Sequence, residues 1–263
     1  MTYHATPGHI EDWELQETIA KLLDITGTPL ALWPIQEITG TTIDDASLNG
    51  YDLTAIASVA TWVTHTKRCT ALQFDNVTRR LYRADAGGDF SFGDGATDDP
   101  FSVIAVIYAS GAIPSHSVVI AKNDPATTKR EWEFRYTATG DGSVAFQMYD
   151  ESVPATIYSS IAMPVVDKPQ MGHWLVYIAT YDGTGTEAGV NIYENGVLVA
   201  QSKIVTGAYV AMENLGVDLT VGSNAVGGEM WEGNILFAGV CSKELSADEA
   251  WSITTLLRGI MGV

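Results

Sequence analysis

The sequence predicts an all-β protein, a two-sheet antiparallel sandwich with a short helix at each end. Three segments lead to this prediction. Residues 131–136 alternate strictly between charged and aromatic side chains, which is typical of a strand with one buried face. Residues 101–108 are apolar on both faces, as in the central strand of a two-layer sandwich. Asn195-Gly196 predicts a hairpin turn, because both residues adopt positive φ at low cost.

The composition supports one large domain. With 263 residues the chain is long enough for one sandwich or two small domains, and we expect one sandwich with short appendages. Hydrophobic residues make up 46% and charged residues 17%, so a sizeable core is expected. The net charge is −18, from 14 basic and 32 acidic residues, which argues against a nucleic-acid surface. Two interpretations of the acidity stay open: a soluble, self-repelling surface, or carboxylate-rich loops that hold a hard cation.

The sequence shows few targeting features. The start, Met1-Thr2-Tyr3-His4, contains neither Lys nor Arg, and no apolar run of a secretory signal follows it. No stretch is long and apolar enough for membrane insertion. We therefore expect synthesis in a cytoplasm without secretory export, unless a signal has been removed. Cys69 and Cys241 leave two alternatives open, a disulfide between neighbouring strands or buried free thiols.

The first element that the sequence predicts is a helix over residues 8–25. Apolar residues at helical spacing line one face, and Gly27-Thr28-Pro29 ends the helix; the apolar stripe consists of Leu15, Ile19, Leu22 and Leu23. Two interpretations of this stripe stay open. It packs against the protein's own sandwich, or it docks on a partner chain.

Strand patterns dominate from Leu30 onward. The alternating segment 131–136 and residues 143–149 flank a Gly-Asp-Gly turn and predict a hairpin. Residues 172–183 predict another long strand that ends at a turn. We expect five large aromatic side chains to be largely buried between the sheets: Trp132, Phe134, Phe146, Trp174 and Phe237.

The last predicted element is a short C-terminal helix. Ser246-Ala247-Asp248-Glu249 has the spacing of a capping box. An apolar face follows at helical intervals, formed by Ala250, Ile253, Leu257 and Ile260.

Several short motifs, taken in their order along the chain, resemble the laminin-G-like, concanavalin A-like jelly roll. They are Trp33, Gly40-Thr41-Thr42, Asp45-Ala46-Ser47-Leu48-Asn49-Gly50, Phe74-Asp75, Trp174, Tyr181-Asp182-Gly183, Tyr193 with Asn195-Gly196, and Leu245-Ser246. The resemblance covers roughly residues 28–250. It implies a jelly roll over residues 28–263 and a helical leader over residues 1–27. It indicates fold rather than function, because this fold hosts lectins, carbohydrate-binding modules, glycosidases, adhesins and virion proteins.

The arrangement of the chain suggests a function for this jelly roll. A single module with a short leader and no signal peptide resembles accessory structural proteins of tailed bacteriophages. We therefore expect a non-enzymatic virion protein, a capsid decoration or fibre-like component. Its partners would be capsid or tail proteins, further copies of itself and a cell-surface glycan. The alternative is a carbohydrate-binding or adhesin module of a secreted, extracellular bacterial protein.

The pattern of carboxylates argues against an enzyme. Glycosidases of this fold carry two or three carboxylates alternating along one strand, and a retaining pair lies about 5–5.5 Å apart. The nearest match here is Glu131-x-Glu133, which is followed by Arg135 instead of a third carboxylate. We interpret these alternating charges as the solvent-facing side of a strand.

The best metal candidate is the loop 42–50, in which Asp44, Asp45 and Asn49 offer oxygen ligands. Jelly rolls that resemble this one often hold a structural calcium ion near an early Asp-rich loop. The alternative is an Asx-type turn without metal. The acidic loop 94–100 allows the same two interpretations.

Aromatic residues near predicted loops are candidates for stacking on sugars. We name Trp62, Tyr209 and Trp231 as candidate ligand-binding residues on this basis. Because most tryptophans of a sandwich belong to its core, burial of each is the competing expectation.

Overall fold

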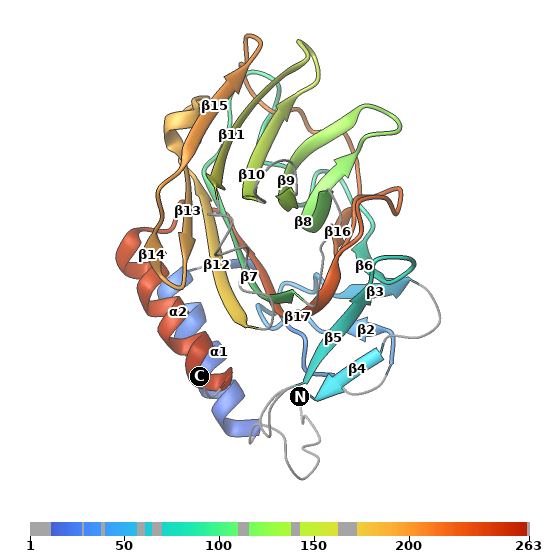
Figure 1. The fold of residues 1–263 in the computed structure, drawn as a ribbon, viewed down its shortest axis with the longest axis vertical. Coiled ribbons are helices and arrows are strands. Elements are labelled where there is room, and N and C mark those ends of the chain that lie inside the picture. Colours follow the sequence, from blue (N-terminus) through green and yellow to red (C-terminus); the bar gives the residue numbers. More distant parts are fainter. Residues whose placement is uncertain are drawn as a thin grey trace.

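The computed structural model describes residues 12–27, 29–37, 40–56, 61–64, 70–109, 116–137, 143–162 and 173–261. Within these ranges the chain folds into two antiparallel β-sheets with a layer of two helices against one of them (Figure 1). This confirms the predicted all-β sandwich with a helix at each end. No helix among these residues is long and apolar enough to cross a membrane.

Sheet A has eight strands within the described ranges and is covered by the helices. Its order is β14-β13-β12-β7-β17-β5-β4, and β1 also pairs with β17. The strands span Val197–Leu198 (β14), Val190–Glu194 (β13), Trp174–Tyr181 (β12), Phe101–Ala109 (β7), Glu232–Cys241 (β17), Thr70–Asp75 (β5), Thr61–Thr64 (β4) and Pro29–Pro34 (β1).

Sheet B has nine strands within the same ranges, in the order β15-β11-β10-β9-β8-β16-β6-β3-β2. These span Ser202–Thr206 (β15), Ala155–Ala162 (β11), Ser143–Asp150 (β10), Lys129–Thr137 (β9), His116–Asp124 (β8), Leu219–Val221 (β16), Arg80–Arg83 (β6), Leu53–Ile56 (β3) and Thr42–Ile43 (β2). A short 3-10 helix, η1 (Glu187–Gly189), precedes β13. The predicted hairpin of residues 131–136 and 143–149 is confirmed, because β9 pairs with β10 from Thr137↔Ser143 to Trp132↔Met148.

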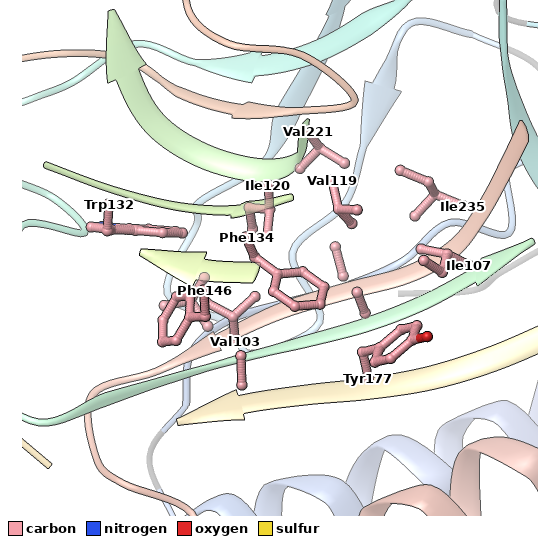
Figure 2. Close-up of a cluster of buried hydrophobic side chains, with 14 of the residues drawn as sticks. Val103, Ile107, Val119, Ile120, Trp132, Phe134, Phe146, Tyr177, Val221 and Ile235 are labelled. Atoms are coloured by element: carbon pink, nitrogen blue, oxygen red, sulfur yellow. The ribbon is translucent and has the colours of Figure 1, made fainter. Parts of the chain in front are cut away.

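The main core lies between the two sheets (Figure 2). Trp132, Phe134 and Phe146 of sheet B point toward sheet A, and the ring of Phe101 lies 5.4 Å from that of Trp132. Four of the five aromatic side chains predicted to be buried are at most 1% exposed: Trp132, Phe134, Phe146 and Phe237. Trp174 is only half-buried, because it stands at the start of β12, where its ring lies against Tyr108.

A second core lies between sheet A and the helices. A β-bulge in β17 between Ile235 and Phe237 turns two consecutive side chains, Leu236 and Phe237, toward the helices. Phe237 is therefore buried outside the space between the sheets. Cys241 is also buried in this layer as a free thiol, while Cys69 lies outside the described residues.

The N-terminal helix α1 spans Asp12–Thr26, and the predicted residues 8–11 lie outside the described part. Its stripe residues Leu15, Ile19 and Leu22 are at most 7% exposed, and they pack in the second core. The interpretation that the stripe packs on the protein's own sandwich is confirmed. Docking of this stripe on a partner chain is wrong, because sheet A already covers it. The division of the chain at residue 27 stays a prediction.

The C-terminal helix α2 (Ala247–Met261) begins with the predicted capping box. The Ser246 N–H donates to the Glu249 carboxylate over 2.7 Å, and the Glu249 N–H donates to the Ser246 hydroxyl over 3.3 Å. The predicted apolar face is buried against sheet A. Since both helices lie on sheet A, the outer face of sheet B is the broad sheet surface that the helices leave open (Figure 1).

Candidate functional site

The outer face of sheet B carries a network of polar side chains at its centre. Because side chains alternate along a strand, burial of Trp132 and Phe134 in the core turns Glu133 and Arg135 of β9 to the outer face. The register places Gln147 of β10 opposite Glu133. We call Glu133, Arg135, Asn123, Tyr149, Gln147, His116 and Glu229 the outer-face network.

Glu133 is the centre of this network and is completely buried. Its carboxylate accepts hydrogen bonds from the Asn123 side-chain amide of β8 and from the Tyr149 hydroxyl of β10. It also forms an ion pair of 3.1 Å with Arg135. The carboxylate therefore joins three neighbouring strands. Burial, together with the negative charge of Glu133, holds the pKa of Tyr149 well above its usual range, so this hydroxyl remains a donor.

Arg135 connects the buried centre to the surface. Its guanidinium donates to Gln147 over 2.8 Å and lies 3.4 Å from the Nδ1 of His116, which in turn lies 3.4 Å from the Glu229 carboxylate. Burial alone would lower the pKa of Arg135, but the charge of Glu133 together with those of Tyr149 and Glu229 raises that pKa. The His116 and Glu229 side chains are 35% and 31% exposed, so this end of the network meets solvent.

Two atoms of the network lack a hydrogen-bond partner among the described residues. They are the Oδ1 of Asn123 and the Nε of Arg135, and both are buried. Such atoms are uncommon in folded proteins, because an unpaired buried polar group costs stability. Unpaired donors and acceptors beside a partly exposed cluster are suited to a ligand or an ordered water.

The solvent-facing interpretation of the charges on β9 is wrong. Glu131 and Glu133 are both completely buried. Glu131 accepts the Leu215 N–H over 3.1 Å and lies 3.6 Å from the Lys122 ammonium. Burial raises the pKa of Glu131, while the Lys122 charge acts against that rise. Both carboxylates therefore hold the fold together, and neither faces solvent as the acid–nucleophile pair of a glycosidase requires.

Asp98 holds Tyr209 in place. Asp98 accepts hydrogen bonds from Tyr209 over 2.7 Å, from Tyr181 over 2.6 Å and from the Met212 N–H over 2.8 Å. Burial raises the pKa of Asp98, and the two tyrosine hydroxyls act against that rise. Tyr209 is half-buried and packs against the main core. As a sugar-stacking residue it stays a prediction.

The other two predicted aromatic residues are Trp231 and Trp62. Trp231 is only 1% exposed and belongs to the main core, so it does not stack on a ligand and that prediction is wrong. Trp231 lies between the turn of residues 222–230 and the first residue of β17. At this position its ring packs inside the sandwich. Trp62 lies on β4, and its side chain lies outside the described part.

The predicted metal loop has the geometry of an Asx turn. The Asp45 carboxylate accepts hydrogen bonds from the Leu32 N–H, the Ser47 N–H and hydroxyl, and the Tyr51 N–H, at 2.7 to 3.1 Å. The Asn49 amide donates to the carbonyls of Pro29 and Leu30. Because the Asp45 oxygens and the Asn49 amide already form hydrogen bonds with neighbouring groups of the chain, this loop fits a calcium ion poorly. Across the described ranges, no three His, Cys, Asp or Glu side chains gather closely enough to hold a metal ion.

The second acidic loop shows the same use of carboxylates. Asp94 accepts the N–H groups of Ala96 and Thr97 at 2.9 and 2.7 Å, which is again an Asx turn. Asp150 and Glu213 also accept backbone N–H groups, from Val210 and Ser152. Many of the acidic side chains therefore stabilise loops by accepting hydrogen bonds from backbone N–H groups.

Sequence reasoning missed two features. It did not identify Asn123 and Tyr149 as partners of Glu133, although the alternation of β9 indicated the shared face. It also missed Trp251, which is 58% exposed on α2. The spacing of the buried residues Ala250, Ile253 and Leu257 would have indicated it, because position 251 lies off their face.

Comparisons with known proteins agree with the jelly roll. A family model described as "Concanavalin A-like lectin/glucanases superfamily" matches residues 84–250. No curated protein sequence matches the chain. A botulinum neurotoxin type C structure is similar with a TM-score of 0.64 at 11% identity, over 90% of this chain and 53% of that chain. Its published description concerns cell entry that depends on interaction with two ganglioside molecules.

Binding domains of other botulinum neurotoxins are similar too. The serotype G domain has a TM-score of 0.62 at 14% identity, over 87% of this chain and 51% of that chain. The serotype D/C domain has a TM-score of 0.62 at 12% identity, over 89% and 53%. This chain thus spans about half the length of these structures, and the likeness concerns the fold alone. With the family match over most of its length, the chain belongs to the concanavalin A-like lectin/glucanase superfamily.

Proposed function

We propose that this chain is a carbohydrate-binding module whose outer-face network on sheet B receives a glycan. The observation that carries the proposal is the cluster of fixed donors and acceptors that reaches solvent at Arg135, His116 and Glu229. Sugar hydroxyls both donate and accept hydrogen bonds, so they match planar carboxylate, amide and guanidinium groups. Because the side chains already hold one another, binding would order few of them.

The comparisons support this class of ligand. The superfamily includes lectins, and the neurotoxin type C structure is described as interacting with gangliosides. The assignment of the ligand to sheet B rests on this chain's own geometry. Sheet A is covered by helices, while the network lies on the surface that they leave open.

The experiment is a glycan array followed by calorimetric titration of the best oligosaccharide. His116→Ala and Glu229→Ala are the test variants, because they leave the buried Glu133–Arg135 pair intact. We expect each to weaken affinity by about ten-fold or more. Arg258→Ala is the control, because Arg258 is exposed on α2, and α2 packs on sheet A rather than on sheet B. It should change the affinity by less than about two-fold. Failure of every glycan to bind, or wild-type affinity in both variants, would refute the proposal.

The virion role is the finer part of the proposal. In this role the chain is a non-enzymatic capsid decoration or fibre-like component of a phage particle, and it attaches to capsid or tail proteins. The jelly roll supports this role in class only, because this architecture occurs in viral capsid domains as well as in lectins. Mass spectrometry and antibody labelling of purified particles test it. Detection in a secreted bacterial polypeptide instead would favour the alternative, an extracellular adhesin or carbohydrate-binding module.

A further inference from the structure

A groove follows the contact between α1 and α2 on the side of the helix layer that faces away from sheet A. One part, beside Ile25 and Trp251, has a volume of about 380 Å³. A second part of about 290 Å³ shares Lys21 with the first and continues to Glu14. The two parts therefore form one continuous groove. The stretch of α1 from Glu14 to Ile25 is about 16 Å long, at about 1.5 Å per residue.

Trp251 stands at one end of this groove with 58% of its surface exposed. No other aromatic side chain among the described residues is as exposed. The turn at Gly196 braces it, because a Cβ added there would lie 3.1 Å from the Cε3 of the Trp251 ring. Beyond the turn, Val197 and Leu198 are 55% and 51% exposed. A braced, exposed tryptophan with aliphatic neighbours is typical of an anchor at a protein–protein contact.

The charges that line the groove are mostly negative. Glu14, Glu17 and Asp24 face it together with a single cation, Lys21. Lys21 is already paired with Glu17 over 2.7 Å, and within the described ranges Glu14 and Asp24 form no ion pair. A partner with positive charges therefore complements the groove. A second copy of this chain would instead bring two acidic grooves together, each on a molecule of net charge −18.

We propose that this groove binds an amphipathic helix of a partner protein whose apolar face is flanked by Lys or Arg. A groove between two packed helices accepts the side-chain ridge of a third helix, and its length matches about three helical turns. Trp251 is the apolar anchor, and Glu14 and Asp24 attract the basic residues. The apolar stripe of α1 takes no part, because it is buried on the opposite side of the helix.

The test uses synthetic peptides of about 14 residues, with Leu at helical spacing and Lys elsewhere. A second peptide carries Glu in place of every Lys. Binding to the full chain is measured by fluorescence anisotropy of the labelled peptide. We expect the Lys peptide to bind, the Glu peptide to bind at least about ten-fold more weakly, and Trp251→Ala and Asp24→Lys each to weaken the Lys peptide by about ten-fold.

Asp99→Lys is the matched control for charge, because Asp99 is exposed and lies on a loop of the sandwich. It should change the affinity by less than about two-fold. Equal losses in Asp99→Lys and Asp24→Lys would show attraction to bulk charge and would overturn the proposal. Wild-type affinity in Trp251→Ala would overturn it too. A wild-type dimer in sedimentation that Trp251→Ala converts to a monomer would assign the groove to a second copy instead.

Discussion

Glu133 and Arg135 stand two positions apart on β9 and form an ion pair of 3.1 Å on the outer face of sheet B. The pair is joined to β8 through Asn123 and to β10 through Tyr149 and Gln147. The polar outer face of sheet B is therefore held by its own side chains. These contacts hold the polar side chains in fixed positions in the middle of the sheet.

Glu133→Gln should lower the free energy of unfolding by about 3–5 kcal/mol, as expected when one partner of a buried ion pair is removed. The substitution removes the negative charge that compensates the Arg135 guanidinium, which is largely buried. Urea denaturation followed by far-UV circular dichroism measures the change. Asp99→Asn, an exposed carboxylate, is the control and should stay within about 0.5 kcal/mol of wild type. Equal stabilities of the two variants would contradict the proposed role of the pair.

Glu37 should make the protein less stable as the pH rises. Burial, opposed by backbone hydrogen bonds and aided by the Asp44 charge, raises its pKa from 4.5 to about 7. The folded state therefore holds the proton more tightly than the unfolded state. The stability due to this proton is full below about pH 4.5, falls as the pH rises to about 7, and stays low above it.

Glu37→Gln should remove this pH dependence and raise the free energy of unfolding at pH 8 by about 2 kcal/mol. The Oε1 that accepts the Asp44 N–H over 3.1 Å is retained as an amide oxygen. Urea titrations of both proteins at pH 4.5 and pH 8 give the comparison. A parallel loss of stability in the two proteins would assign the effect to other groups.

Deletion of residues 1–27 should prevent stable folding. It removes three buried aliphatic side chains, which contribute about 5–9 kcal/mol by transfer from water, against a typical total stability of about 5–15 kcal/mol. These are Leu15, Ile19 and Leu22. Leu22→Ala is the milder variant and should cost about 2–5 kcal/mol. A truncated protein with wild-type stability in thermal melting would show that α1 is dispensable to the core.

The Asp45 loop gives a test of calcium. Asp45→Ala leaves several backbone N–H groups without their acceptor, so we expect a loss of about 1–3 kcal/mol. We expect the same wild-type melting temperature in a chelator and in excess calcium. A rise in melting temperature with calcium that Asp45→Ala abolishes would instead support the metal site predicted from the sequence.

Two glycines should respond in opposite ways to alanine. At Gly259 on α2 an added Cβ meets nothing within 4 Å, so Gly259→Ala should stabilise the helix by about 0.5–1 kcal/mol. At Gly222, φ is 83° and an added Cβ would lie 2.1 Å from the Phe74 ring, so Gly222→Ala should destabilise. Thermal melting of the pair distinguishes these effects, and a shift of equal sign would contradict the packing described here.

Local chemistry made much of the fold predictable. The alternation of residues 131–136, the Asn195-Gly196 turn and the capping box at Ser246 and Glu249 depend on neighbours in sequence, and the structure confirms them. Asn195 and Gly196 indeed adopt positive φ, 50° and 82°. Such patterns predict which side chains lie on the same face of a strand or helix.

The partners that pack on each face could not be predicted in the same way, because they come from distant parts of the chain. Glu133 is buried because Asn123 and Tyr149 arrive from two other strands, and the β8–β9 register contains bulges that no pattern in the sequence indicates. The position of Trp231 near a loop predicted exposure, but its ring lies in the core directly before β17. The apolar stripe of α1 allowed two partners, and only the three-dimensional arrangement distinguishes sheet A from a foreign surface.

The layer order, helices on sheet A and sheet A on sheet B, separates the two proposed binding surfaces (Figure 1). The helix groove lies at one end of the stack and the outer-face network at the other, with both sheets between them. Adjacent layers are about 10 Å apart, so an occupant at one end does not shield the other. Together the two proposals predict a bivalent adaptor, attached through its helices while it displays its open sheet to a second target.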